Sequence, residues 1–409
     1  MAAGTLTGSG DALARRDRAL ELSGWGQPFR FVQPHNLCFW VYLALSAVGL
    51  VHLVRYFGPG SGVVGTGLAA GTIAVAIYGL LFLAFLRLTD HYERQPRTLV
   101  LAAFLWGGVA GTFGFALTAN TAMLAIYPKL FGQAFGADWS AALTAPLTEE
   151  TGKAAGFILL LGLAPRLIRS AYDGVFIGAF IGLGFQLFEN VLYSFNTAIT
   201  AFGVNQTDAA LGTFAARAFS GVFSHTLFSA LFCCGLIFAI GTAIQPRRLG
   251  LGIGLMVLAM IAHGCWDSAS ALGDGTPLGL LAAILVGIAA LIAVIRALRR
   301  TAPQEREFLR AILEPEVENG TLTAEELDAV CAPRKQRRQF IRAGKGHKRH
   351  HTTKHVLRAA LDLAHEIAAA GGRENARVAH ERGEIERLRG ALPQDDRAAG
   401  QPTPAPRPG

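Results

Sequence analysis

Apolar residues fill most of the first 300 positions, in long blocks separated by short polar loops. A transmembrane helix needs about 20 consecutive, mostly apolar residues. The alternation of apolar and polar residues that is typical of strands does not occur in these blocks. The pattern predicts an all-α, polytopic membrane protein with about eight transmembrane helices: 37–56, 63–88, 98–127, 140–164, 174–197, 214–245, 249–272 and 277–297.

Basic residues gather in every second loop. They lie in the N-terminal segment, in the loops after the second, fourth and sixth spans, and directly after the eighth; Lys129 is the main exception. Because short basic loops stay in the cytoplasm, both termini are predicted to be cytoplasmic, and an even number of spans requires the same sidedness. The polar, basic residues 1–36 lack a small-residue cleavage site, so we expect no signal-peptide processing.

Composition agrees with this topology. The 409 residues are 52% hydrophobic and 16% charged, and the mean hydropathy is +0.37. Residues 1–297 contain only 16 of the 37 Lys and Arg and 13 of the 29 Asp and Glu. An ordinary soluble enzyme, a secreted disulfide scaffold and a wholly disordered chain are therefore excluded. We expect a cytoplasmic N-terminal segment (1–36), an eight-helix membrane domain (37–297) and a charged cytoplasmic tail (298–409).

Several ionisable side chains lie inside the predicted spans, where each charge costs about 2.5–3.5 kcal/mol. Together they would cost on the order of 10–15 kcal/mol, so they must pair, bind an ion or line a wet cavity. At about 1.5 Å per residue, the carboxylates and histidines among them fall in the outer half of the bilayer. The residues are Glu149, Glu150, Lys153, Glu189, His225, His263 and Asp267.

The spacing of these residues indicates that some of them act together. Lys153 is four residues after Glu149 and three after Glu150, so it can neutralise one carboxylate of the pair. His263 and Asp267 are four residues apart and share a helix face. They could serve as two ligands, or as one ligand and the group that orients it.

Three of these segments resemble motifs of the PrsW family of intramembrane proteases. EETGK (149–153) resembles that family's EExxK motif, FQLFEN (185–190) resembles its FxxxEN segment, and His263 with Asp267 resembles its late histidine motif. The wider group includes the CAAX prenyl-protease-like membrane proteins. The resemblance covers 37–297 and implies a metalloprotease, in the bacterial plasma membrane, that cuts other membrane proteins such as membrane-bound anti-sigma factors. It assigns the paired glutamates, Glu189 and His263 to the site, and His225 less directly.

Peptide hydrolysis needs an activated water and a stabilised oxyanion. Histidines and carboxylates can hold Zn²⁺ or another divalent metal with one position open for water. We expect His225, His263 and either Glu189 or Asp267 as ligands. Glu149 or Glu150 would then be the general base, tuned by Lys153. A metal-free version, in which a glutamate activates water and the histidines bind the oxyanion, uses the same residues and stays open. The HExxH motif of zincins does not occur.

Two other classes of protein place charges inside a membrane. An ion- or proton-coupled transporter could use the same acids and histidines as a relay, but it would predict repeated halves, which the sequence does not contain. A noncatalytic scaffold could use them to hold helices together.

Three further polar residues are interpreted as structural: Arg217 as an interfacial anchor, and His52 and Asn120 as satisfied polar groups.

The tail is predicted to be partly helical. Residues 303–332 indicate two short helices around an Asn-Gly-Thr turn, with Thr323 and Glu326 as a capping box. Residues 333–358 contain ten Lys or Arg, four His and no acid, which favours anionic lipid as a partner; no nucleic acid is expected. A charged helix over 356–392 should break at Gly371-Gly372, and residues 401–409 are disordered by composition.

Overall fold

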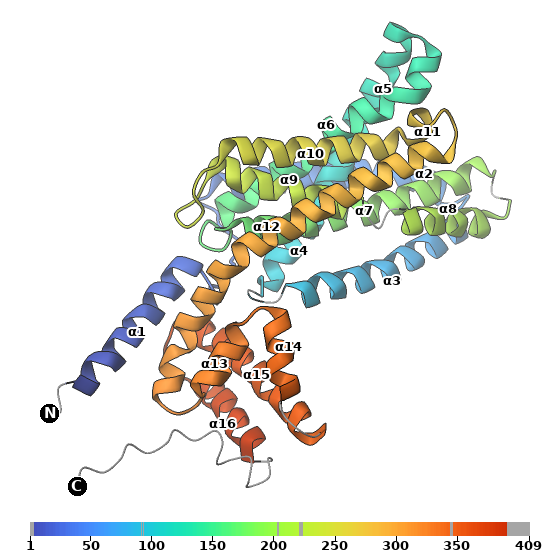
Figure 1. Cartoon of the computed structure of the whole chain (residues 1–409). Helices are drawn as coiled ribbons and strands as arrows, with labels where there is room; N and C mark the ends of the chain where they lie inside the picture. Colours follow the sequence, from blue (N-terminus) through green and yellow to red (C-terminus); the bar gives the residue numbers. More distant parts are fainter. Residues whose placement is uncertain are drawn as a thin grey trace, which may run out of the picture. The chain divides into compact units, whose positions relative to one another are not determined.

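The computed structural model describes residues 4–90, 92, 94–202, 204–220, 224–343 and 347–390 (Figure 1). Every element in these ranges is a helix. This confirms the prediction of an all-α, polytopic protein. The predicted disordered end, 401–409, lies outside the described residues.

Packing divides the chain into two units. The membrane unit is Phe29–Thr301, and the terminal unit combines Met1–Pro28 with Ala302–Gly409. The boundaries expected from sequence, at 36/37 and 297/298, mark where the apolar blocks begin and end. Packing instead assigns the first residues of the chain to the same unit as the tail.

The described part of the membrane unit contains eleven complete elements and the first part of a twelfth, α12. They are α2 (Leu37–Ser61), α3 (Gly65–Thr89), α4 (Arg97–Leu105), η1 (Trp106–Ala116), α5 (Leu117–Phe131), α6 (Gln133–Leu163), α7 (Ala171–Thr200), α8 (Gln206–Ser220), α9 (His225–Ile240), α10 (Leu249–Asp267), α11 (Ala269–Leu272) and α12 (Pro277–Glu318). The buried helix α7 packs against α9, η1, α3 and α8, and α10 packs against α9 and α6.

Among the described residues, six helical segments are long and apolar enough to cross a membrane: 37–61, 65–89, 97–131, 171–200, 249–267 and 277–318. Two predicted spans are not among them. Helix α6 includes four charged residues, Asp138, Glu149, Glu150 and Lys153, and the apolar helix α9 has only 16 residues. The chain is an integral membrane protein, and the count of eight crossings stays a prediction.

The third predicted span, 98–127, is helical throughout but changes its winding in the middle. Its central 11 residues, WGGVAGTFGFA, form the π-helix η1. A Cβ atom at Gly107 would lie 1.9 Å from the carbonyl oxygen of Ile181, so glycine allows this wide segment to lie against α7. Segments of π-helix occur frequently beside functional sites.

The sixth predicted span, 214–245, is not one helix, and this prediction was wrong. Helix α8 ends at Ser220 and α9 begins at His225. Residues 221–223 lie outside the described part of the chain. The α8 sequence is far more polar than that of α9, and α8 packs on α3 and α7, whereas α9 is almost entirely buried. His225 therefore lies at the first turn of a helix, not in the middle of one.

Glycines on α7 allow α9 to approach it closely. A Cβ atom at Gly178 would lie 2.4 Å from the carbonyl oxygen of Ser229, and one at Gly182 would lie 2.3 Å from that of His225. Both distances are too short for any side chain. The contact between α7 and α9 thus requires glycine at these two positions, and it places the beginning of α9 beside the middle of α7.

The terminal unit is built from both ends of the chain. It contains α1 (Gly4–Ser23), the end of α12, α13 (Ala324–Cys331), α14 (Arg334–Ala343), α15 (His347–Ala369) and α16 (Ala376–Gly390). The Trp25 ring stacks on His365 at 5.5 Å, and its Nε1 donates to Glu305. Gly26, with φ +72°, lies directly against the backbone of Ala368.

Two local predictions for the tail are confirmed. Thr323 and Glu326 form the capping box at the beginning of α13. The break expected at Gly371-Gly372 separates α15 from α16, and both glycines have positive φ. Burial raises the pKa of the Cys331 thiol to about 11, which keeps this cysteine in its unreactive form.

Candidate active site

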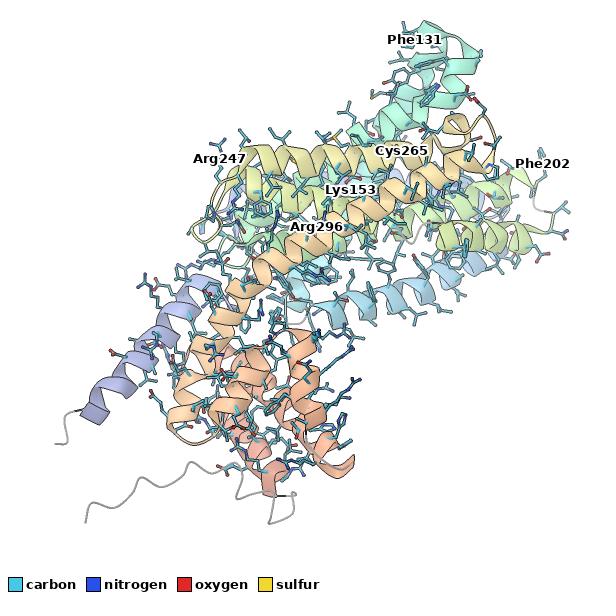
Figure 2. All side chains as sticks on the ribbon, in the orientation of Figure 1. Phe131, Lys153, Phe202, Arg247, Cys265 and Arg296 are labelled. Atoms are coloured by element: carbon cyan, nitrogen blue, oxygen red, sulfur yellow. The ribbon has the colours of Figure 1, made fainter. Side chains whose placement is uncertain are left out.

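All seven ionisable residues predicted from the sequence meet in the interior of the membrane unit. Helix α6 supplies Glu149, Glu150 and Lys153, α7 supplies Glu189, α9 supplies His225, and α10 supplies His263 and Asp267. Figure 2 shows Lys153 among the helices, between Arg247 at one end of the unit and Phe131 and Phe202 at the other.

Glu150 is fully buried and already has several partners. Its Oε1 accepts hydrogen bonds from Lys153 Nζ at 2.7 Å and from His263 Nδ1 at 3.0 Å. Its Oε2 accepts from the Ser229 hydroxyl at 3.4 Å. Because Nδ1 of His263 is bound to this carboxylate, the other ring nitrogen, Nε2, is directed elsewhere.

His225 has a similar arrangement with a different carboxylate. Its Nε2 lies 2.7 Å from Glu189 Oε2, and its Nδ1 lies 3.1 Å from Lys153 Nζ. An ammonium group can only donate, so Nδ1 is the accepting nitrogen and Nε2–H donates to Glu189. Each histidine thus has one nitrogen fixed by a glutamate and one nitrogen that faces the middle of the cluster.

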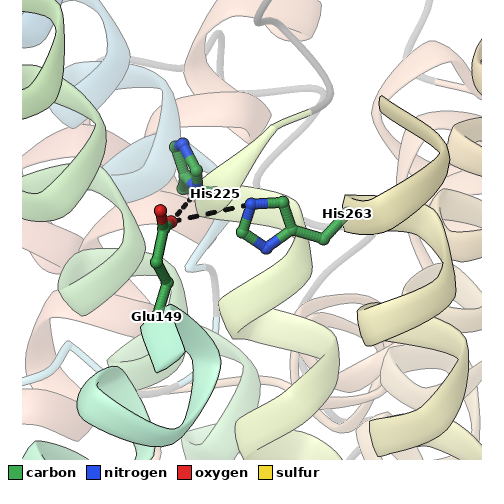
Figure 3. Close-up of side chains that lie close together, drawn as sticks. All are labelled: Glu149, His225 and His263. Carbon is green, nitrogen blue, oxygen red and sulfur yellow. Dashed lines mark ion pairs between the residues drawn. The ribbon is translucent and has the colours of Figure 1, made fainter. Parts of the chain in front are cut away.

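Glu149 lies in front of both of these nitrogens (Figure 3). Its Oε2 is 3.6 Å from His263 Nε2 and 3.7 Å from His225 Nδ1, and its Oε1 accepts from Asn120 Nδ2 at 3.0 Å. Within the described part of the chain, Glu149 Oε2 and His263 Nε2 make no hydrogen bond, although both are buried. A buried polar atom without a partner is costly, so this pair indicates a missing ligand.

The donor set fits a divalent cation. One ligand atom each from Glu149, His225 and His263 lie within 4.8 Å of one another. In a tetrahedral site each donor is about 2.0–2.1 Å from zinc, which places neighbouring donors about 3.3 Å apart. The separations of 3.6 and 3.7 Å are close to this value. Lys153 Nζ, also 3.7 Å from Glu149 Oε2, shows that positive charge is accommodated here.

Asp267 is the least buried acid of the cluster. Its side chain is 22% exposed, and its Oδ2 lies 3.4 Å from His263 Nε2. As the last residue of α10, it lies where the helix ends. The i,i+4 contact between His263 and Asp267 that the spacing predicted is therefore present.

Aromatic side chains enclose the cluster. Phe185 lies under the Lys153 ammonium, with Nζ 4.0 Å from the ring centroid. Phe228 stacks on His263 with centroids 5.2 Å apart. These rings exclude water from the polar groups, which strengthens the electrostatic interactions among them.

Arg217, interpreted from the sequence as an interfacial anchor, contacts the buried cluster. Arg217, on α8, donates from Nη2 to Glu189 Oε2 at 2.7 Å and from Nε to Asn190 Oδ1 at 2.8 Å. Its guanidinium lies 3.9 Å from the centroid of the Tyr193 ring. The sequence did contain a signal: Glu189 has no basic residue on its own helix, so its counter-ion had to come from another one.

Asn120, interpreted as a structural polar group, also belongs to the cluster. It donates to Glu149 and accepts from the Thr148 hydroxyl. Asn120 is on α5 and Glu149 is on α6, so the contact depends on how these two helices pack. His52, by contrast, bonds the Phe113 carbonyl and contacts none of the seven cluster residues in the described structure.

The chain was compared with known proteins. The profile of a family described as "PrsW family intramembrane metalloprotease" matches residues 95–295. The chain is 31% identical over 199 residues to the protein named Protease PrsW from Geobacillus kaustophilus (strain HTA426), covering 46% of this chain and 74% of that protein. It is 26% identical over 198 residues to Protease PrsW from Bacillus subtilis (strain 168), covering 46% and 77%. No solved structure matches the chain.

The matched residues, 95–295, include all seven members of the buried cluster. They include no residue of the terminal unit. A transporter is not favoured, since both relatives named above are proteases. The chain belongs to the PrsW family of intramembrane metalloproteases and is a peptidase.

Proposed function

We propose that the chain hydrolyses peptide bonds of other membrane proteins at a divalent-cation site formed by Glu149, His225 and His263. The observation that supports this most directly is the arrangement of the two histidines. Each has one nitrogen fixed by a glutamate, while the other faces Oε2 of Glu149, which makes no hydrogen bond in the described structure. Carboxylate–histidine pairs of this kind orient the ligands in metal sites.

Glu149 Oε2, His225 Nδ1 and His263 Nε2 would hold the cation, and Lys153 Nζ would then give up its hydrogen bond to His225 Nδ1. Zn²⁺ is the ion that best matches one oxygen and two nitrogen ligands. When bound, it would act as a Lewis acid on the substrate carbonyl and make water a stronger nucleophile. Glu150 and Glu189 then act as orienting groups, because each already accepts a hydrogen bond from a histidine and another from a basic side chain. Lys153 offsets the negative charge of the two α6 glutamates.

Asp267 is the best candidate for the general base. Glu150 has hydrogen bonds to both of its oxygens, and Glu189 is bound to Arg217 and His225. Asp267 contacts His263 and is the acid that water can reach most easily. We infer that it accepts the proton of the attacking water and returns it to the leaving amine.

We also propose that the reaction takes place in the outer half of a bacterial plasma membrane, with both termini cytoplasmic. The alternation of basic loops supports this orientation, since Arg166, Arg247 and Arg248 all lie at connections expected on the inner side. The substrates would be membrane-bound regulators such as anti-sigma factors, as family membership suggests. A scissile bond in or beside the outer part of their transmembrane segments would be required.

The decisive experiment is to profile new protein termini in membranes of cells that express wild type or Glu149→Gln at matched levels. The control is Glu314→Gln, which removes an acid in the terminal unit that pairs with Arg15 at the surface. We expect termini in or beside transmembrane segments with wild type and the control, and none with Glu149→Gln. Identical profiles from all three folded proteins would contradict the proposed site.

A second proposal concerns the tail: α14 binds anionic lipid headgroups. None of its residues is buried, and its exposed basic side chains include Arg334, Arg338 and Arg342, which repeat every four residues and so share one face. Each such charge contributes about 1 kcal/mol near an anionic surface. The experiment compares proteolysis protection of α14 in nanodiscs of phosphatidylcholine with and without phosphatidylglycerol. Equal cleavage in both would exclude the interaction.

A further inference from the structure

Arg217 connects the helix before the histidine to the glutamate that orients that histidine. We propose that Arg217 is a positioning residue of the active site: it holds Glu189 in place and thereby fixes which nitrogen of His225 faces Glu149. The proposal rests on the cation site proposed above. It assigns a role in the reaction to a residue of α8, a helix that contributes no member of the predicted cluster.

One carboxylate oxygen joins Arg217 to His225. Glu189 Oε2 accepts from Arg217 Nη2 at 2.7 Å and lies 2.7 Å from His225 Nε2. Both contacts are charge-assisted and short, so the carboxylate cannot rotate without losing one of them. While Oε2 is held, Nε2 carries the proton, and Nδ1, which accepts from Lys153 Nζ at 3.1 Å, stays on the side of Glu149, 3.7 Å from its Oε2. Without Arg217, the carboxylate can turn, and the His225 ring loses the contact that fixes its orientation.

The shape of the guanidinium explains why the residue is arginine. Its Nη2 binds Glu189 while its Nε binds Asn190, the next residue on α7. Neighbouring side chains on a helix point about 100° apart, so one group must span both. The Tyr193 ring, 3.9 Å from the guanidinium carbon, fixes the plane of the fork. A lysine could offer charge to one partner but not the planar pair of donors.

An interfacial anchor would direct its charge toward lipid headgroups. Arg217 instead directs it into the protein: its side chain is 28% exposed and that of Glu189 is 13% exposed. The break in the predicted sixth span explains why Arg217 and His225 both reach Glu189. Arg217 lies on the last turn of α8 and His225 on the first turn of α9, so one segment provides both partners of Glu189.

The experiment measures Zn²⁺ affinity of the purified full chain by competition with a chelating indicator. The variants are Arg217→Gln, Arg217→Lys, Glu189→Gln and the double variant Arg217→Gln/Glu189→Gln. The matched control is Arg55→Gln, which changes an exposed arginine on α2, another helix of the membrane unit. Thermal unfolding of each protein checks that it is folded.

We expect Arg217→Gln to weaken Zn²⁺ binding about 10- to 100-fold, the usual effect of losing a group that orients a ligand. Arg217→Lys should recover only part of this loss, and Arg55→Gln should bind as wild type does. In the Glu189→Gln background, Arg217→Gln should change the affinity by less than about threefold, because the arginine acts through the glutamate. If Arg217→Gln alone does not fold, the double variant, which has no unpaired charge, and Arg217→Lys still provide the test.

Three results would overturn the proposal. Folded Arg217→Gln with the wild-type affinity would show that the arginine does not position the site, and Arg217→Lys with the wild-type affinity would show that the planar pair of donors is not needed. Independent, additive losses from Arg217→Gln and Glu189→Gln would show that it does not act through Glu189. Wild type that binds no Zn²⁺ would refute the cation site itself, and this outcome differs from the other two because it needs no variant.

Discussion

The two units of the chain differ in how completely their buried carboxylates are hydrogen-bonded. In the terminal unit, Glu316 is fully buried, but the Arg382 guanidinium binds both of its oxygens, at 2.7 and 2.9 Å. In the membrane unit, Glu149 is equally inaccessible, yet one of its oxygens has no hydrogen bond in the described structure and faces two histidine nitrogens. A buried carboxylate with hydrogen bonds to both oxygens is typical of a stabilising contact, whereas a buried oxygen without one indicates a site that binds something else.

Metal removal should separate the two units most strongly. Chelator treatment followed by dialysis should lower the rate of cleavage of a membrane substrate at least about 100-fold, because the cation activates the water and the carbonyl. Added Zn²⁺ should restore the rate. Hydrogen exchange in the terminal unit should not change, since its ion pairs are internal. Full cleavage by metal-depleted protein would favour the version in which a glutamate activates water without an ion.

Gly182→Ala tests whether the site depends on the close approach of α7 and α9. The new Cβ would lie 2.3 Å from the His225 carbonyl, so the helices must separate, and overpacking of this kind costs about 1–3 kcal/mol. We expect a fall in cleavage rate larger than the fall in amount of folded protein. The matched control, Gly383→Ala on α16, meets nothing within 4 Å and should stabilise its helix by up to about 1 kcal/mol.

Arg382→Met tests the closed pair of the terminal unit. It leaves the buried Glu316 carboxylate without its main partner, which should lower the free energy of unfolding of this unit by about 2–3 kcal/mol. Cleavage activity in the membrane unit should be nearly unchanged. The measurement is hydrogen exchange of α12 and α16 amides, together with a cleavage assay. Loss of cleavage with intact exchange would reveal coupling between the units.

Thr323→Ala should have the smallest effect. It removes the hydroxyl that accepts from Glu326 N–H at 3.1 Å, and loss of such a cap costs about 1 kcal/mol. Faster exchange should be confined to α13 amides. Thr323→Ser, which keeps the acceptor, is the control; equal exchange in the two variants would mean that the capping box contributes little.

The sequence alone determined those features that depend on neighbours along the chain. Apolar blocks predicted the long helices, because insertion into lipid depends on the summed composition of about 20 residues. The spacing in EETGK predicted that Lys153 can neutralise one of the two glutamates, and its Nζ lies 2.7 Å from Glu150. The Thr323–Glu326 capping box and the helix break at Gly371-Gly372 were also predicted from the sequence, since capping and positive φ are local properties.

Only the tertiary structure decided the features that depend on how helices are rotated and packed. Three contacts of the cluster join residues 28 or more positions apart: Glu189 with Arg217, Glu149 with Asn120, and Glu150 with Nδ1 of His263. The stacking of Trp25 on His365 joins residues 340 positions apart. Composition requires that charges inside a membrane find partners, but it does not determine which partners, because that depends on the distances between helices that only the folded chain defines.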